Sequence, residues 1–164
     1  MQHPIGITRN DVEVYIDLVK SKAAPRIAYA PNLLGLAKEL CTRLKVTGAE
    51  VRIDRNMGRV IGNAYVVETS SKDSILYARR VHDTAFTRFV KNSMPEPSPY
   101  LSIILKRDEA GRYELHDIWV GRLNPPGPGS DNETATSKAY WLNHAFVFDG
   151  QPIQLRTVTK LCPY

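Results

Sequence analysis

The region from residue 100 to residue 164 constrains the fold of this chain most, because strand, turn and loop signals follow one another along it. Residues 100–106 are strongly apolar, and residues 112–121 alternate apolar and polar side chains, as strands do. Residues 108–111 between them have the composition of a turn, with Gly111 suited to the left-handed region. The pattern predicts a long β-hairpin and therefore a sheet in this half of the chain.

The end of the chain continues with a loop, a short helix and a second hairpin. Residues 123–131 are rich in proline and glycine, and Thr136 or Ser137 is suited to cap the helix that follows. Two β-rich segments, residues 145–148 and 153–159, flank the turn dipeptide at 149–150. We expect these two segments to pair with each other.

The first 48 residues carry helical periodicity. Apolar residues recur at helical spacing after residue 10, and again on one face after Pro31 until Gly48. The sequence therefore predicts a helical N-terminal extension over residues 1–48, folded as a helical hairpin. Residues 49–164 are expected to form one antiparallel α+β domain.

The middle of the chain predicts a hairpin and a helix. Residues 50–55 alternate, Gly58 suits a turn, and residues 59–69 are β-rich. Ser71 is then suited to cap a basic helix over residues 72–91, which bears arginines and a lysine. The expected fold class is α+β, with the N-terminal helical hairpin followed by a twisted antiparallel sheet packed on this basic helix.

Composition favours an anionic partner and excludes several classes of protein. The net charge is +5 and the isoelectric point about 9.3, a balance that favours polyanions or acidic proteins. The two cysteines, Cys41 and Cys162, form no disulfide framework, and the four histidines lack metal-ligand spacing. We therefore expect no metal and no cofactor. The N-terminal residues lack a signal peptide and no apolar run is long enough to span a membrane, so a cytoplasmic location and no membrane partner are expected.

The basic segment is the first candidate for chemistry. Arg88 and Lys91 are three residues apart and share a helix face. Arg79 and Arg80 are adjacent and point in different directions, and Arg80 lies near that face, two turns earlier, if the helix is unbroken. Guanidinium groups match a phosphate with two parallel hydrogen bonds and stabilise the charge of phosphoryl transfer. The same residues are equally consistent with a solvated helix face.

Two histidines are candidates for proton transfer, since imidazole titrates near neutral pH. His82 lies among the arginines of the basic segment. His116 shares a strand face with Glu114 and Ile118 if alternation is strict. A histidine at a helix break and a histidine on the wet face of a sheet are the structural alternatives.

Two further groups are candidates for substrate binding. Trp141 and His144 lie on one side of a helical turn and are suited to stack on bases, or to anchor the proline loop to the core. Arg156 and Thr157 on the last strand suit an oxyanion, or a plain sheet edge.

The segment YARRVHDTAFTRF and the strand pair YLSIILKRDEAGRYELHDIWVG resemble the small metal-free RNase toxins of the barnase, EndoU, colicin and RelE group. The resemblance covers about residues 69–159 and implies a helix packed on an antiparallel sheet lined with basic and hydroxylic residues. It implies site roles for His82, Arg88, His116 and Thr157. The long proline loop and the helix at residues 137–143 depart from that pattern. The stretch from RFVKNSMPEPSPY to SKAYWLNHAFVF is also similar to a family of bacterial proteins, a likeness that implies no activity.

These features predict a metal-free endoribonuclease of the toxin type, in which a ribose 2′-hydroxyl attacks the adjacent phosphate. Arg79 and Arg88 would neutralise charge, and His82 or His116 would move the proton. The alternatives are a non-catalytic module that binds nucleic acid or an acidic protein, and a protein acting on or binding a small anionic ligand. The expected partners are RNA or another polyanion, an inhibitor protein, and a second copy of the chain in a homodimer.

Overall fold

The computed structural model describes residues 7–9, 12–15, 30–44, 46–80, 86–148 and 155–163. The chain forms two compact units, each built from two separate segments. Unit 1 comprises residues 1–62 and 97–123, and unit 2 comprises residues 63–96 and 124–164. This division differs from the expected boundary at residue 48, since the helix before that boundary packs on strands from residues 50–120 within unit 1.

Unit 1 is a five-stranded sheet with one helix on it. The strands lie in the order β1-β2-β10-β9-β3, and the helix is α2, Asn32–Cys41. The strand bounds are Ile7–Arg9 (β1), Val12–Tyr15 (β2), Glu50–Asn56 (β3), Tyr100–Arg107 (β9) and Tyr113–Val120 (β10). All neighbours are antiparallel except β10 and β2, which are parallel.

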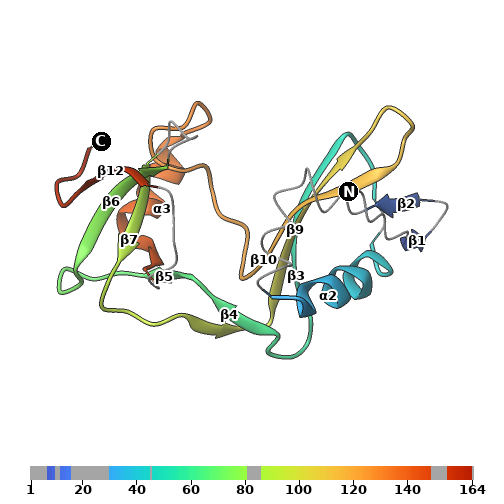
Figure 1. The fold of residues 1–164 in the computed structure, drawn as a ribbon, viewed down its shortest axis with the longest axis horizontal. Helices are drawn as coiled ribbons and strands as arrows, with labels where there is room; N and C mark the ends of the chain where they lie inside the picture. The colour runs from blue at the N-terminus through green and yellow to red at the C-terminus, as the bar shows by residue number, and fades with distance from the viewer. Residues whose placement is uncertain are drawn as a thin grey trace. The chain divides into compact units, whose positions relative to one another are not determined.

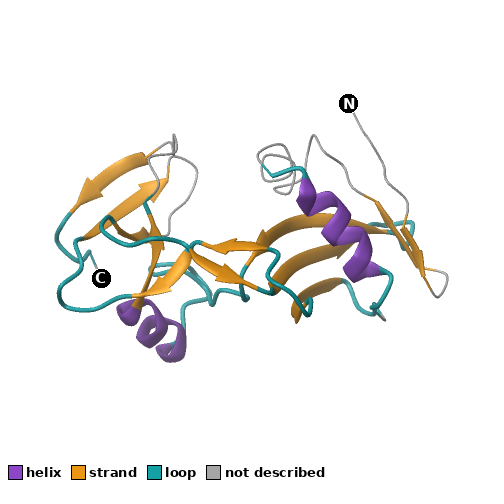
Figure 2. Ribbon diagram, turned by 90° about the horizontal axis from the view of Figure 1, so that it is seen from below, coloured by secondary structure: helices purple, strands orange, loops and turns teal. Residues whose placement is uncertain are grey.

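Helix α2 forms where the sequence predicts it, directly after Pro31. Its leucines Leu33, Leu36 and Leu40 are buried, and they pack in one cluster with the apolar faces of β9 and β10. Figure 2 shows α2 lying along these strands. The burial of this face, at about 25 cal/mol per Å² of apolar surface, is what holds the helix to the sheet.

The β9–β10 hairpin confirms the prediction from residues 100–121. Residues 101–105 of β9 are all buried, and Leu101, Ile103 and Leu105 belong to the cluster under α2. In the turn, Arg112 N donates to Asp108 Oδ1 at 2.9 Å, and Gly111 has φ +82°. A residue other than glycine is strained at that φ, so the turn depends on Gly111.

The other predictions for unit 1 need correction. Residues 12–15, expected in a helix, form β2, and residues 16–29 lie outside the described residues. Strand β3 forms as expected, but it pairs with β9 and not with residues 59–69. The predicted hairpin is therefore wrong, because β3 gains a long buried partner in β9 that local sequence does not reveal.

Unit 2 is a second five-stranded sheet, in the order β12-β6-β7-β11-β5, with the helix α3, Ala135–Asn143. Its strand bounds are Val66–Glu68 (β5), Ile75–Arg80 (β6), Phe86–Val90 (β7), His144–Val147 (β11) and Leu155–Thr159 (β12). Neighbours are antiparallel except β11 and β7, which are parallel. Figure 1 labels β5, β6, β7, β12 and α3 in this unit. The α+β class is confirmed, although each sheet contains one parallel pair.

The predicted basic helix over residues 72–91 is wrong. Its two halves are β6 and β7, an antiparallel hairpin whose connection, residues 81–85, lies outside the described residues. Ser70 and Asp73, close to the expected cap, form a tight turn instead: Ser70 N donates to Asp73 Oδ2 at 2.6 Å. Side chains of this kind satisfy turns as readily as helix caps.

The predicted pairing of the two C-terminal strands with each other is also wrong. Strands β11 and β12 both form, but β11 lies between β7 and β5, and β12 pairs with β6 at the sheet edge. Helix α3 is confirmed, with Thr134 as its N-cap.

Two short strands, β4 (Gly62–Ala64) and β8 (Glu96–Ser98), form a two-stranded sheet of their own. Within the part of the chain that the structure describes, no helix is long and apolar enough to cross a membrane.

Candidate anion-binding face

The β6–β7 hairpin places two arginines on one face of the unit 2 sheet. Tyr77 pairs with Arg88, and Arg79 pairs with Phe86, in an unbroken antiparallel register. Directly opposite residues share a face, so these four residues lie on the same side of the sheet. We call this surface the arginine face. Arg79 and Arg88 are diagonal neighbours on it, and such residues lie about 7–8 Å apart.

Arg88 is held at the middle of the sheet. Its side chain is only 8% exposed, and Nη1 donates to Thr69 Oγ1 at 2.7 Å and to the His144 carbonyl oxygen at 3.0 Å. Thr69 follows β5 and His144 begins β11, so this one guanidinium joins β7 to two other segments of the sheet. Its Nε is buried and finds no hydrogen-bond partner among the described residues.

Arg79 lies nearer the edge, on β6. Its Cζ lies 4.9 Å from the centroid of the Phe86 ring, a cation–π contact across the strand pair. Like Arg88, it has a buried Nε with no hydrogen-bond partner among the described residues. The register places Thr157 of β12 opposite it.

Neither Arg79 nor Arg88 takes part in any ion pair found among the described residues. A buried donor without a partner costs about 1–3 kcal/mol, and more when it is charged. Two such donors on one face are suited to a further acceptor, and an anion would satisfy both the hydrogen bonds and the charge.

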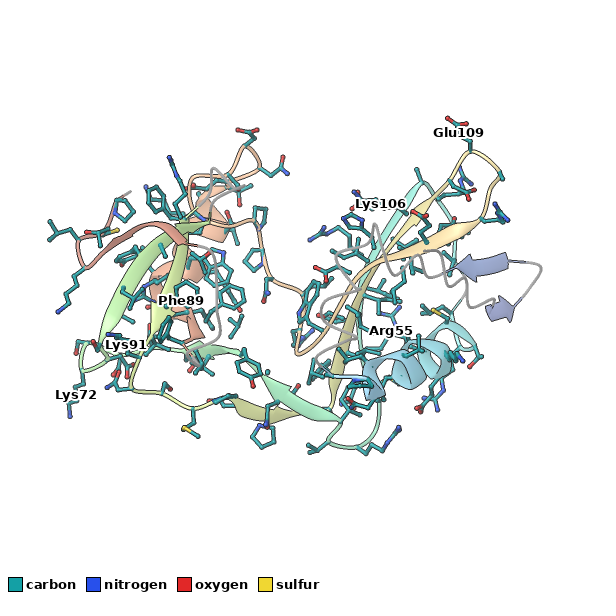
Figure 3. The ribbon with its side chains drawn as sticks, in the orientation of Figure 1. Arg55, Lys72, Phe89, Lys91, Lys106 and Glu109 are labelled. Carbon is teal, nitrogen blue, oxygen red and sulfur yellow. The ribbon has the colours of Figure 1, made fainter. Side chains whose placement is uncertain are left out.

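The opposite face of the same sheet is apolar. Leu76, Ala78 and Phe89 form its buried cluster, with Phe146 and Phe148 packed against it. Figure 3 shows the side chain of Phe89 from β7. This face belongs to the core. The arginine face also carries a small apolar cluster, around Val67 and Val90, beside its two arginines.

Trp141 and His144 belong to the apolar side. Trp141 is 3% exposed, stacks on Phe146 at 5.5 Å between centroids, and donates from Nε1 to the carbonyl oxygen of Pro126 at 3.0 Å. The His144 ring stacks on Tyr140 at 3.8 Å, with Nδ1 at 2.9 Å from the Tyr140 carbonyl oxygen. These contacts match the alternative in which the aromatic residues anchor the proline loop.

The pKa of Tyr140 reflects its burial on the apolar side of the sheet. Burial, with the Glu68 carboxylate as a smaller cause, raises the pKa of its phenol above the ordinary value.

His116 occupies a bulge in unit 1. The β10–β9 register shifts between Leu115 and Asp117, which leaves His116 as the extra residue. The bulge ends strict alternation, so Ile118 returns to the core face and is fully buried. The expected face shared by His116, Glu114 and Ile118 therefore does not form.

The remaining predicted site residues are only partly placed. Lys91 is exposed directly after β7, near Lys72, at the end of the hairpin away from residues 81–85 (Figure 3). His82 lies in residues 81–85, outside the described residues. For Arg80, Arg156 and Thr157 the structure describes the backbone in β6 and β12, and Arg156 is the extra residue where the β12–β6 register shifts.

Sequence reasoning missed two members of this site, Thr69 and Tyr77. Thr69 was assigned to the end of a strand, and only the tertiary fold brings its hydroxyl to Arg88. Tyr77 alternates with the apolar residues of β6, and a strand period over residues 75–80 is the signal that would have found it.

The described residues contain no group of three metal-ligating side chains. No protein-family model, curated protein or solved structure matches this chain. The resemblance to the RNase toxins therefore stays a prediction.

Proposed function

We propose that the protein binds a phosphate-bearing polyanion, RNA being the first candidate, through the arginine face of unit 2. The observation that carries the proposal is the pair of buried Nε donors on Arg79 and Arg88, which have no acceptor among the described residues. A phosphate oxygen supplies an acceptor and a negative charge at the same point.

The burial of Arg88 limits what can bind there. At 8% exposure it offers little surface to a ligand, so a length of polymer backbone cannot lie along it. Arg79 is half-buried, so it can contact the phosphate from the solvent side. The ligand is therefore expected to insert one phosphate, and the net charge of +5 favours a polyanion over an isolated small ion.

A metal-free ribonuclease is the second candidate. The observation that favours it is the position of His82, in the five-residue connection between the two strands that carry Arg79 and Arg88. A histidine beside a bound phosphate can transfer the proton of the attacking 2′-hydroxyl, while the guanidinium groups stabilise the developing charge.

Binding is tested with a fluorescent oligoribonucleotide whose anisotropy is followed as protein is added. Arg79→Gln removes one charged donor and is expected to weaken binding about 10- to 100-fold, the value of a charge-assisted hydrogen bond. Lys72→Gln removes the same charge from an exposed site in the same unit and is expected to change affinity less than twofold. Equal losses in the two variants would refute the arginine face as the binding site.

Cleavage is tested with the same labelled RNA in EDTA. The nuclease candidate requires cleavage that is lost in His82→Ala and kept in His116→Ala, because His116 belongs to unit 1. RNA that binds but stays intact at high protein concentration would support the binding function and rule out the nuclease.

A further inference from the structure

The outer edge of strand β3 has no partner strand among the described residues. β3 pairs with β9 along one edge, and no other described strand pairs with it. Seven residues, Glu50–Asn56, make it the longest edge strand of the described sheets. An exposed strand edge carries unpaired backbone N–H and C=O groups, which natural proteins cover or use for association.

The hydrogen bonds to β9 show which residues of β3 face this open edge. Arg107 N donates to the Ala49 carbonyl oxygen, and Met57 N donates to the Pro99 carbonyl oxygen, each at 2.8 Å. The register between these two bonds is unbroken, so odd-numbered residues bond to β9 throughout. The even-numbered residues therefore turn their backbone groups outward: Glu50, Arg52, Asp54 and Asn56.

One contact supports this assignment independently. The carbonyl oxygen of Asp54, an even-numbered residue, accepts a hydrogen bond from Arg55 Nη1 at 2.8 Å. Because that guanidinium belongs to an exposed side chain, the Asp54 carbonyl is open to solvent and not part of the ladder to β9.

The outward residues are complementary to a second copy of themselves. We propose that two copies of this chain associate by antiparallel pairing of their β3 strands, with Arg52 of each copy opposite Asp54 of the other. A twofold axis then passes between the two Ile53 residues. All eight outward residues are paired, in four hydrogen-bonded pairs that exchange about eight backbone hydrogen bonds.

Charge selects this register over its neighbours. Backbone geometry allows only pairings in which outward residues face each other, so the register can shift only in steps of two. One shift places Arg52 opposite Arg52 and Glu50 opposite Asp54, and the other places Asp54 opposite Asp54. Like charges directly opposite each other destabilise a strand pair, whereas opposite charges stabilise it.

The two charged groups are available for this pairing. Arg52 is half-exposed and has only a 3.7 Å contact with Glu50 of the same strand. The Asp54 carboxylate accepts from Leu123 N at 2.8 Å and pairs with Arg122 Nε at 3.5 Å, both through Oδ2, which orients it and leaves Oδ1 for the guanidinium of the second copy. Arg55 releases the Asp54 carbonyl when the backbone N–H of the second copy takes its place.

Sedimentation equilibrium of the full chain over a range of concentrations tests the association. The wild type is expected to approach twice the monomer mass as concentration rises. Arg52→Asp places an acidic side chain opposite Asp54 of the other copy, at two positions in the dimer. It is expected to raise the dissociation constant at least tenfold. Lys72→Asp makes the same charge change in unit 2 and is expected to leave it unchanged. A monomer at all concentrations, or equal effects of the two variants, would overturn the proposal.

A crosslink tests the register separately, in a Cys162→Ser background. Ile53→Cys places two thiols at the axis in a non-hydrogen-bonded pair, where Cα atoms lie about 4.5 Å apart and a disulfide can form. Val51→Cys, on the same face and also packed against the core, is expected to form no disulfide on oxidation because residue 51 faces residue 55 of the second copy. Crosslinking of both variants, or of neither, contradicts this register.

Discussion

Cys41 and Cys162 show how burial at single residues determines reactivity. Cys41 is 3% exposed inside the α2 cluster, and burial raises the pKa of its thiol to about 11. Cys162 is exposed near the C-terminus. The thiolate is the reactive form of cysteine, so the two residues differ both in access and, for Cys41, in the fraction that is ionised.

We therefore predict that one thiol per chain reacts rapidly with a disulfide reagent at pH 8 in the native protein. At that pH only about one Cys41 in a thousand is ionised, given the pKa of about 11. The second thiol is expected to react at the unfolding rate, and both are expected to react at once in denaturant. Cys162→Ser serves as the control, in which the rapid phase disappears; two rapid phases in the native wild type would contradict the burial of Cys41.

Glu39 links helix α2 to the segment after β3. Its carboxylate receives Arg59 Nη1 at 3.0 Å and Arg59 Nη2 at 2.9 Å, and also Arg43 Nη2 at 3.1 Å. The hydrogen bond from Arg59 is the largest cause that holds the pKa of the Glu39 carboxyl below its usual 4.5. Desolvation opposes it, and the charges of Arg59 and Arg43 are smaller causes that also lower the pKa. Because the pKa is lower in the folded state, the folded protein binds this proton less tightly than the unfolded chain.

This pKa shift predicts a pH-dependent contribution to stability. It is complete above about pH 4.5 and is lost as pH falls through the lower pKa of the folded state. The difference in free energy of unfolding between wild type and Glu39→Gln should thus be largest near neutral pH and shrink in acid. Urea titrations at a series of pH values measure it. Arg59→Gln should show the same dependence, and the double variant should add little if the two side chains act as a pair.

At the scale of elements, helix α3 depends on its N-terminal cap. Ser137 N donates to Thr134 Oγ1 at 3.1 Å, and Thr134 N donates to Ser137 Oγ at 2.7 Å, which completes a capping box. The sequence indicated Thr136 or Ser137 as the cap, and Thr136 is an exposed residue inside the helix.

We predict that Thr134→Ala lowers the free energy of unfolding of unit 2 by about 1 kcal/mol, the usual value of a helix N-cap. Thr136→Ala is the matched control and should change it by less than about 0.5 kcal/mol, as exposed substitutions usually do. Urea denaturation followed by the fluorescence of the buried Trp141 measures both. Equal losses would show that the cap is not where these hydrogen bonds place it.

Local elements could be predicted from sequence where all the local signals indicated the same structure. The β9–β10 hairpin, α2 and α3 fall in this class, because turn residues and helical spacing agree along each segment. The basic segment does not, since Ser70 and Asp73 satisfy a turn as well as a helix. The strand period of Ile75, Tyr77 and Arg79 was the decisive signal there.

Strand pairing and the site depended on information that local sequence lacks. β3 finds its partner in β9 across about fifty residues, and β12 pairs with β6 in place of its sequence neighbour. Arg79 and Arg88 were grouped correctly as cations, but their shared face comes from a hairpin and not from a helix. The acceptors of Arg88, on Thr69 and His144, come from segments on either side of it in the chain and are set by the sheet alone.

At the scale of the whole molecule, the two units have separate cores within the described residues. The cluster around α2, β9 and β10 contains residues of unit 1 only, and the clusters on the two faces of the other sheet contain residues of unit 2 only. The chain passes between the units three times, so neither is a continuous segment. The two tryptophans report on them individually, because Trp119 belongs to unit 1 and Trp141 to unit 2.

We predict that shortening a buried side chain in one unit mainly lowers the urea midpoint of that unit. Leu115→Ala and Phe89→Ala each remove a buried side chain, at an expected cost of about 2–5 kcal/mol. In a Trp141→Phe background, where fluorescence follows unit 1, Leu115→Ala should lower the urea midpoint and Phe89→Ala should change it little. In a Trp119→Phe background the order should reverse. Identical shifts at both reporters for both variants would show that the interleaved chain unfolds as one cooperative body, despite its two cores.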